Sequence, residues 1–289
     1  MALIIILIGL LVEHFVGVSD DIRRLDWFNQ YVHWLENRLT QYKVWNGAAG
    51  VIITLSGPLL IILLIDYVLL SLFMPLSLLF ALAVLLYSLG PKYLNPQLDD
   101  YIHALEAGDE MQADELALEF LNRDDTHQRN EQAIIENILI QANERLFGII
   151  FWLLILGPFG ALLYRLASLL RLEQLDIHGS YPDASRDLYN ILNWPTARLL
   201  ALGNALSGHL VDAFEAWGKN EKNSLQLNEV VIKASGLGAL QYRPQSSNAD
   251  DTLAEDSGYW FRMVQGLLNR TLIVWLIVLG LMTLAGWLG

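Results

Sequence analysis

Long apolar runs are the feature of this sequence that most restricts its fold. Five of them interrupt otherwise polar sequence, and each is close to the length that a helix needs to cross the hydrocarbon core of a bilayer. Apolar residues make up 54% of the chain and charged residues only 17%. The sequence therefore predicts an all-α fold, a polytopic helical membrane protein with about 4–5 membrane segments. The runs cover residues 2–18, 48–65, 67–89, 146–170 and 270–288.

The connections between the first three runs predict how they are used. The first run contains Glu13 and His14, but no basic residue precedes it and no small-residue cleavage site follows. We therefore expect a retained span rather than a signal peptide. Only Asp66 and Tyr67 separate the second and third runs, and so short a connection predicts an antiparallel helical hairpin.

The fourth run carries a helix-breaking sequence near its middle. Pro158 lacks a backbone donor and Gly157 loosens the helix, so this segment is predicted to be kinked or broken. A kinked single crossing would separate residues 91–145 from residues 171–269 by the membrane. Residues 171–270 nevertheless hold 9 of the 18 basic residues. An excess of basic residues favours the cytoplasmic side, so this region is predicted to be cytoplasmic as well. A re-entrant hairpin would remove this conflict, and the sequence leaves both alternatives open.

Two polar stretches have helical patterns of their own. Residues 19–47 combine arginine and lysine with tryptophan and tyrosine, which predicts an amphipathic cytoplasmic segment at the headgroup level. Residues 96–122 predict a soluble helical hairpin that Gly108 breaks, with Asp109 as the N-cap of its second helix. Residues 91–145 contain 13 acidic and 4 basic residues, so this part is strongly anionic.

These patterns divide the chain into five parts. A further helix is predicted over 196–215, starting after Pro195, and a mobile stretch over 244–256. The parts are an N-terminal membrane region (1–90), an acidic soluble hairpin (91–145), a segment with several polar motifs (146–215), a polar helical and mobile region (216–269) and a C-terminal span (270–289).

Composition also excludes several classes of function. The chain has no cysteine, so it can form neither a disulfide nor a thiolate metal site. A net charge of −13 disfavours nucleic acid as a partner. The phosphate loop of nucleotide-binding proteins and the nucleophile elbow of hydrolases are both missing, and the six histidines have no metal-ligand spacing. Catalytic and metal-binding residues therefore stay unassigned by local motif.

Polar residues in a fixed order surround the fourth apolar run. They are Arg123, Asp125, Thr126, Glu136, Phe151-Trp152, Pro158, Gly160-Ala161-Leu162 and Tyr164-Arg165, followed by Asp187, Asn190, Pro195, Ala197, Arg198 and Leu199. This order resembles that of the CobD/CbiB family of membrane amide synthases in cobalamin biosynthesis. The resemblance covers roughly residues 120–215, while the ends match only in hydropathy.

The chain departs from the family pattern at several polar positions. Ile140, Gln141 and Glu144 stand where the synthases have a Glu-Asn pair and an aspartate, and residues 168–173 replace another polar run. This degenerate pattern is similar to the AmpE branch of the family. That resemblance implies a regulatory or signalling protein of the bacterial inner membrane, linked to β-lactamase induction and cell-wall recycling, with no assigned chemistry.

The resemblance implies a cytoplasm-facing ligand pocket built from the retained positions. Its candidate residues are Arg123, Asp125, Thr126, Glu136, Asn137, Tyr164, Arg165, Asp187, Asn190 and Arg198. Each has a simpler explanation as well. Asp125 and Thr126 could cap a helix, Arg165 could snorkel to the interface, and Asp187 could pair with Arg198.

The alternative function is a working membrane ligase. It would join an amine to a carboxylate with ATP and Mg²⁺, which the family resemblance implies as cofactors. A third reading is a scaffold whose polar positions serve packing alone. Expected partners are the lipid bilayer, a cell-wall-derived or nucleotide ligand, and a protein that docks on the acidic hairpin 96–122.

Overall fold

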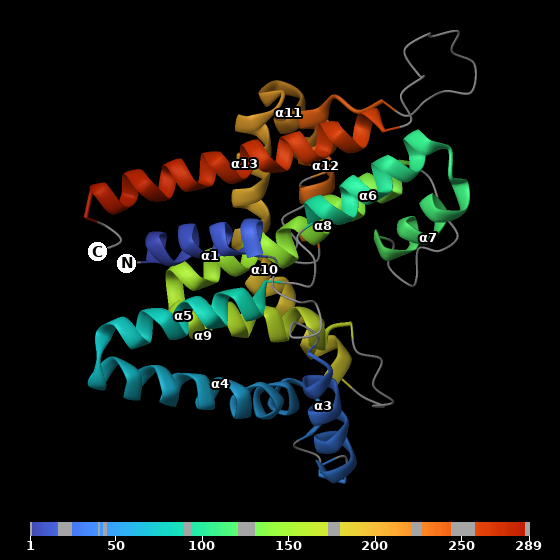
Figure 1. The fold of residues 1–289 in the computed structure, drawn as a ribbon. Coiled ribbons are helices and arrows are strands. Elements are labelled where there is room, and N and C mark those ends of the chain that lie inside the picture. The colour runs from blue at the N-terminus through green and yellow to red at the C-terminus, as the bar shows by residue number, and fades with distance from the viewer. Residues whose placement is uncertain are drawn as a thin grey trace, which may run out of the picture. The chain divides into compact units, whose positions relative to one another are not determined.

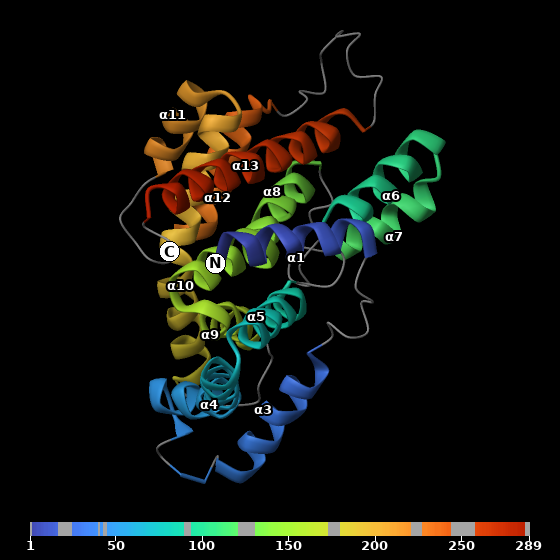
Figure 2. The same cartoon turned by 60° about the vertical axis from the view of Figure 1, so that its left-hand side comes forward.

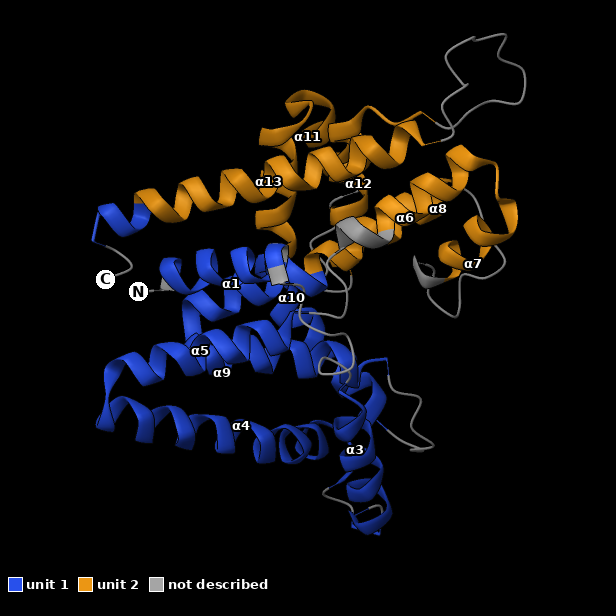
Figure 3. Cartoon of the chain, viewed as in Figure 1, with its two compact units in different colours: residues 1–91, 144–196, 282–289 blue, residues 92–143, 197–281 orange. Residues whose placement is uncertain are grey.

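The computed structural model describes residues 2–16, 25–39, 41–42, 45–89, 94–120, 131–172, 180–220, 227–243 and 258–286. All regular secondary structure in these ranges is helical, which confirms the predicted all-α class. The stretch 244–256, predicted to be mobile, lies outside the described residues. The chain forms two compact units, residues 1–91 with 144–196 and 282–289, and residues 92–143 with 197–281 (Figure 3).

The first unit contains the strongly apolar helices α1 (Ala2–Val16), α4 (Ala48–Leu72), α5 (Met74–Ser88) and α9 (Gly148–Leu170), whose course Figures 1 and 2 show. It also contains α3 (Asp26–Leu39) and the first part of α10 (Tyr181–Ser207). Across both units, three described helical stretches are long and apolar enough, by length and composition, to cross a membrane: Ala48–Leu72, Glu131–Leu170 and Tyr259–Leu284.

α3 is the amphipathic helix that the aromatic, basic loop predicted. Phe28, Val32 and Leu35 follow helical spacing and are buried in the core of the first unit. Trp27 and Trp34, on other sides of the helix, are 43% and 54% exposed. A helix with one apolar face and exposed tryptophans suits the headgroup level of a bilayer.

α4 and α5 form the expected antiparallel hairpin, but its turn lies at Phe73 rather than at Asp66 and Tyr67 (Figure 1). Phe73 has extended backbone angles, and the proline that follows in the first turn of α5 starts the new helix. Asp66 stays inside α4 because the Ser77 hydroxyl donates a hydrogen bond to its carboxylate at 3.0 Å. A polar residue in an apolar run therefore did not mark the turn.

α9 is a helical hairpin. Gly157 breaks the helix with φ 65° and ψ −153°, and Pro158 begins the second arm. A Cβ on Gly148 would lie 2.3 Å from the Tyr164 ring, although these residues would be about 24 Å apart in a straight helix. The two arms therefore pack against each other, and both ends of α9 lie on one side. The chain thus folds back at this break, as the hairpin alternative predicts.

The second unit contains α6 (Leu94–Ala107), α7 (Glu110–Phe120), α8 (Glu131–Ala142), α11 (Leu210–Asn220), α12 (Asn228–Leu240) and most of α13 (Tyr259–Leu284). The predicted break at Gly108, with φ 70°, is confirmed. The backbone N–H of Gln112 donates a hydrogen bond to the Asp109 carboxylate at 3.1 Å, so Asp109 is the N-cap of α7. Tyr101 of α6 packs edge-on against Phe261 of α13, with 4.9 Å between ring centroids.

α10 corrects the prediction of a helix over 196–215. The helix begins at Tyr181, includes Pro195, and ends at Ser207, and Gly208 separates it from α11. Proline inside a helix frees a carbonyl of the preceding turn and opens the hydrogen bonds around it. The Trp152 indole N–H donates to the Leu192 carbonyl at 3.0 Å, so the α9 hairpin supplies a bond beside this irregular turn.

Candidate functional site

The base of the α9 hairpin gathers polar side chains in the first unit. The polypeptide enters α9 through a short π-helix, η3 (Asn143–Phe147), and one-turn π segments are frequent at functional sites. We call the polar group at this base the hairpin-base cluster. It consists of Glu144, Arg145, Tyr164, Arg165, Arg171, Tyr189 and Asn193.

Glu144 joins both ends of the hairpin to α10. Arg171, just after α9, donates a hydrogen bond from Nη2 to Oε1 of Glu144. The Tyr189 hydroxyl donates to the same oxygen at 2.7 Å. The Arg171 guanidinium also lies over the Tyr189 ring, 4.0 Å from its centroid. Glu144 and Arg171 are only 12% and 14% exposed, so this is a largely desolvated ion pair.

Tyr189 is a donor under ordinary conditions because its phenol stays protonated. Burial is the main cause that raises the pKa of Tyr189 well above 10, and the neighbouring Glu144 carboxylate raises it further. The hydroxyl therefore keeps its proton at physiological pH and stabilises the Glu144 anion.

Tyr164 connects the second arm of the hairpin to α10. Its hydroxyl donates to Oδ1 of Asn193 at 3.2 Å, and Thr196 donates to the same oxygen at 2.9 Å. Its ring lies against Gly148, where no larger side chain would fit. Gly160 has a similar role, because a Cβ there would lie 2.2 Å from the Trp152 carbonyl oxygen. The motif residues Trp152, Gly160 and Tyr164 thus close the hairpin and dock it on α10.

Arg165 is the most unusual group of the cluster. Its side chain is 8% exposed, and its Nε has no hydrogen-bond acceptor among the residues that the structure describes. Its charged neighbours are Arg145 and Glu144. The cluster contains three arginines and one glutamate. A buried guanidinium whose Nε has no acceptor among the described residues favours an anionic ligand.

The predicted site residues fall in different places. Tyr164 and Arg165 belong to the hairpin-base cluster. Asp187 is exposed on α10 and Asn190 is half-buried one turn later, in the same unit. Arg123, Asp125 and Thr126 lie outside the described residues.

The other predicted residues belong to the second unit and have structural partners there. Glu136 accepts a hydrogen bond from Gln132 at 2.7 Å and pairs with Lys233 of α12 at 3.2 Å. Arg198 donates to Asn228, at the start of α12, so the expected salt bridge with Asp187 is replaced by another partner. The Asn137 amide donates to the Ala133 carbonyl of its own helix at 3.0 Å.

Sequence reasoning missed five members of the cluster: Glu144, Arg145, Arg171, Tyr189 and Asn193. Glu144 was interpreted only as a departure from the family pattern, because it stands where the synthases have an aspartate. The hairpin alternative, if followed through, would have pointed to Glu144 and Arg171. Once α9 folds back, residues just before it and just after it must lie side by side.

The chain matches the family model described as "CobD/Cbib protein" over residues 6–249. The chain belongs to the CobD/CbiB family. It is 31% identical over 167 residues to "Cobalamin biosynthesis protein CobD" of Chromobacterium violaceum, which covers 55% of this chain and 53% of that protein. It is 28% identical over 128 residues to the protein of the same name in Stutzerimonas stutzeri, covering 40% and 41%.

The match thus spans about half of each of these curated relatives. No solved structure matches the chain.

These findings overturn the expected regulatory function. Both curated CobD/CbiB relatives carry names from cobalamin biosynthesis, and neither name refers to β-lactamase induction or signalling. The error came from weighting the degenerate positions above the retained ones. The structure gives the retained positions Trp152, Gly160 and Tyr164 specific contacts within the hairpin and α10.

Proposed function

We propose that this CobD/CbiB protein is a membrane amide synthase of the adenosylcobinamide-phosphate synthase type, acting in cobalamin biosynthesis in the bacterial inner membrane. It would join an amine to a carboxylate of a large amphiphilic substrate, with ATP and Mg²⁺. Membership of the family over residues 6–249 and the names of the two CobD relatives support this proposal.

The observation that carries the proposal is the buried Arg165 in the hairpin-base cluster. ATP-dependent amide synthesis handles two kinds of anion, the carboxylate that is activated and the phosphates that activate it. An arginine that is 8% exposed, with Nε lacking an acceptor among the described residues, is suited to binding either anion. Glu144 and Tyr189 would hold Arg171 in place within the same cluster.

The chemistry requires positioning more than a reactive side chain. Transfer of the γ-phosphoryl group from ATP to a carboxylate oxygen would release ADP and give an acyl phosphate. The amine would then attack the carbonyl carbon, so that a C–N bond forms, the C–O bond to phosphate breaks, phosphate leaves and the amine gives up a proton to water. Preorganised guanidinium groups stabilise the negative charge in such steps. The absence of cysteine is compatible with this route, since it needs no thiol nucleophile.

The described residues fit Mg²⁺ only in part. They contain no group of three or more His, Cys, Asp or Glu side chains that could hold a metal ion by themselves. Mg²⁺ is commonly held by one or two carboxylates together with substrate phosphates, and Glu144 is the carboxylate of the cluster. Bound Mg²⁺ would supply charge neutralisation for the phosphates of ATP.

Substitution of Arg165 tests the proposed function. The purified protein is supplied with ATP, Mg²⁺ and the corinoid acid and amine that together make adenosylcobinamide phosphate, and the amide is measured by mass spectrometry. We expect the wild type to form it, and Arg165→Ala to lower kcat on the order of 100-fold, as loss of a charge-stabilising donor does. Arg165→Lys should retain part of the activity.

The matched control is Arg186→Ala, an arginine on α10 that is 65% exposed and pairs weakly with Asp183 at 3.8 Å. It should keep wild-type activity. The proposal fails if the wild type forms no amide under these conditions, or if Arg165→Ala is as active as Arg186→Ala while both proteins stay folded.

Two narrower predictions accompany the proposal. The resemblance to the AmpE branch rests on Ile140, Gln141 and Glu144, and it stays a prediction about the position of this chain within its family. The docking of a protein partner on the acidic hairpin also stays a prediction.

A further inference from the structure

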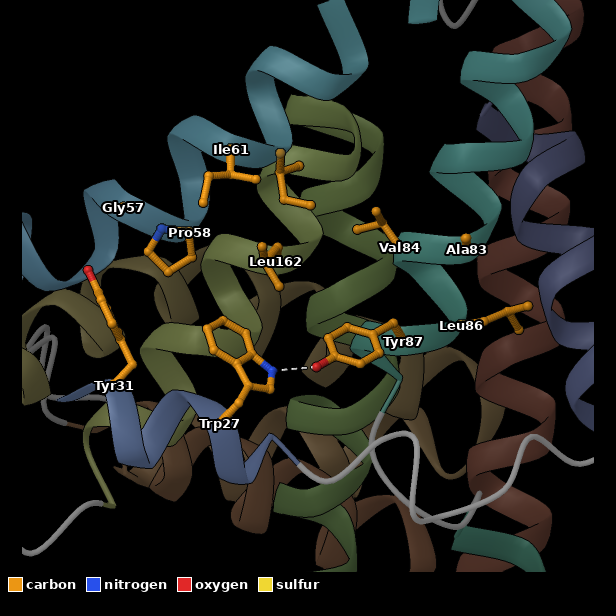
Figure 4. Close-up of a pocket in the computed structure, with 11 residues that line it drawn as sticks. Trp27, Tyr31, Gly57, Pro58, Ile61, Ala83, Val84, Leu86, Tyr87 and Leu162 are labelled. Atoms are coloured by element: carbon orange, nitrogen blue, oxygen red, sulfur yellow. Dashed lines mark hydrogen bonds between the residues drawn. The ribbon is translucent and has the colours of Figure 1, made fainter. Parts of the chain in front are cut away.

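A cavity of about 680 Å³ lies in the first unit, among α3, α4, α5 and α9. Figure 4 shows side chains from α3, α4 and α5 around it, with Leu162 of α9 behind them. Its lining includes Trp27, Tyr31, Pro58, Ile61, Val84 and Leu162. The volume is in the range of small-molecule binding sites, which run from roughly 300 to 1,000 Å³.

The chemistry of the walls favours an apolar occupant over water. Most lining side chains are aliphatic. Three lining side chains carry a polar group, and two of these groups satisfy each other, because the Trp27 indole donates to the Tyr87 hydroxyl at 2.5 Å; the third is the Tyr31 hydroxyl. An ordered water needs about 2–4 polar partners, and these walls offer few. A hydrocarbon chain needs no hydrogen-bond partners and can pack against the aliphatic side chains of the lining.

The surroundings of the cavity indicate where the hydrocarbon comes from. α4 is long and apolar enough to span a membrane, and its residues Leu60, Ile61 and Leu64 are 63%, 59% and 62% exposed in this chain. Such a face contacts lipid acyl chains. The cavity shares Ile61 with that face, so its lining is continuous with the lipid-facing surface of α4.

One end of the cavity has the chemistry of the headgroup level. Trp27 and Tyr31 come from the amphipathic α3, and tryptophan and tyrosine are enriched where the bilayer meets water. The Tyr31 hydroxyl lies close to α4, since a Cβ on Gly57 would be 2.6 Å from it. At this position it can donate to an ester or phosphate oxygen.

We propose that the cavity binds one acyl chain of a membrane phospholipid, with the glycerol and headgroup at the Trp27 and Tyr31 end of α3. The aliphatic walls fit the chain, and the aromatic end fits the polar boundary of the same molecule. A bound phospholipid would hold α3 against α4 and α5. This site is separate from the hairpin-base cluster and does not depend on amide synthesis.

Photolabelling tests this lipid site. The full-length protein is reconstituted in phosphatidylcholine vesicles that contain a phosphatidylcholine with a photoreactive group at the end of one acyl chain, and the labelled residues are mapped by mass spectrometry. We expect labelling of Ile61 and Val84 to exceed that of Leu60 and Ile52, which are exposed on α4 but do not line the cavity.

Filling the cavity should remove this labelling. Ile61→Trp is the filling variant, and Ile52→Trp is its control, because Ile52 lies on the same helix, is 66% exposed and is not part of the lining. We expect loss of labelling at Val84 in the first and wild-type labelling in the second. Ala83→Phe is a second filling variant in case Ile61→Trp does not fold.

Three outcomes would overturn the proposal. The first is equal labelling of cavity residues and other lipid-facing residues in the wild type. The second is undiminished labelling of Val84 in a folded filling variant. The third is labelling by a photoreactive free fatty acid but not by the phospholipid, which would assign the cavity to a single-chain amphiphile.

Discussion

Gly160→Ala is expected to prevent the α9 hairpin from closing. The added Cβ would lie 2.2 Å from the Trp152 carbonyl oxygen and 2.6 Å from the Leu156 Cβ. The first of these contacts is with backbone, so a rotamer change cannot relieve it. Overpacking typically costs about 1–3 kcal/mol, and we expect the upper end of that range or more. The measurement is the fraction of monodisperse protein left after heating in detergent.

Gly266→Ala is the matched control for this prediction. Gly266 lies inside α13, and a Cβ there would meet nothing within 4 Å. Alanine favours a helix over glycine by about 1 kcal/mol, so this variant should be at least as stable as the wild type. If Gly160→Ala and Gly266→Ala resist heat equally, the two arms of α9 do not pack as described.

Glu144→Ala is expected to destabilise the protein and abolish its activity. The change leaves the Arg171 guanidinium, 14% exposed, without its carboxylate partner, and it removes the acceptor of the Tyr189 hydroxyl. Breaking a buried ion pair from one side commonly costs about 3–5 kcal/mol. The free energy of unfolding should fall by an amount of this order, measured as the loss of heat resistance in detergent.

A double variant separates the structural role of this pair from its functional role. Glu144→Leu with Arg171→Leu replaces the ion pair by apolar side chains, which is often neutral for stability. We expect it to recover heat resistance but not amide synthesis, because the charges of the cluster would be gone. Recovery of activity as well would show that the pair serves folding alone.

An exposed ion pair provides the comparison. Glu215 and Lys219 of α11 are 59% and 71% exposed and contact each other at 2.7 Å. Such helical surface pairs contribute about 0.3–0.5 kcal/mol, so Glu215→Ala should change neither heat resistance nor activity measurably. A loss as large as that of Glu144→Ala would contradict the explanation by burial.

Local sequence signals predicted individual elements well where a single residue sets the backbone. The break at Gly108 and the N-cap at Asp109 follow from short-range chemistry, and the structure contains both. The predictions from local sequence were wrong where a contact with a residue far along the chain, or the continuation of a helix, determined the structure. Asp66 predicted a turn, but Ser77 satisfies it inside α4; Pro195 predicted a helix start, but α10 continues through it.

The candidate site shows the same difference. The sequence pointed to Tyr164 and Arg165 through their place in the family pattern. It treated Glu136 and Arg198 in the same way, although Glu136 pairs with Lys233 and Arg198 donates to Asn228. Residue type alone could not separate these cases. An arginine that bonds to a residue of its own protein and an arginine that is available to bind a ligand have the same side chain.

The sequence by itself determined the all-helical membrane class, the family and the place where the fourth apolar run breaks. These follow from composition, from the order of motif residues, and from the backbone limits of Gly157 and Pro158. Only the tertiary structure decided that this break makes a hairpin, and therefore that Glu144 meets Arg171 and Tyr189. The reason is physical: a helix break fixes where the chain can turn, while the direction of the turn depends on the close packing of Gly148 and Gly160 against the opposite arm.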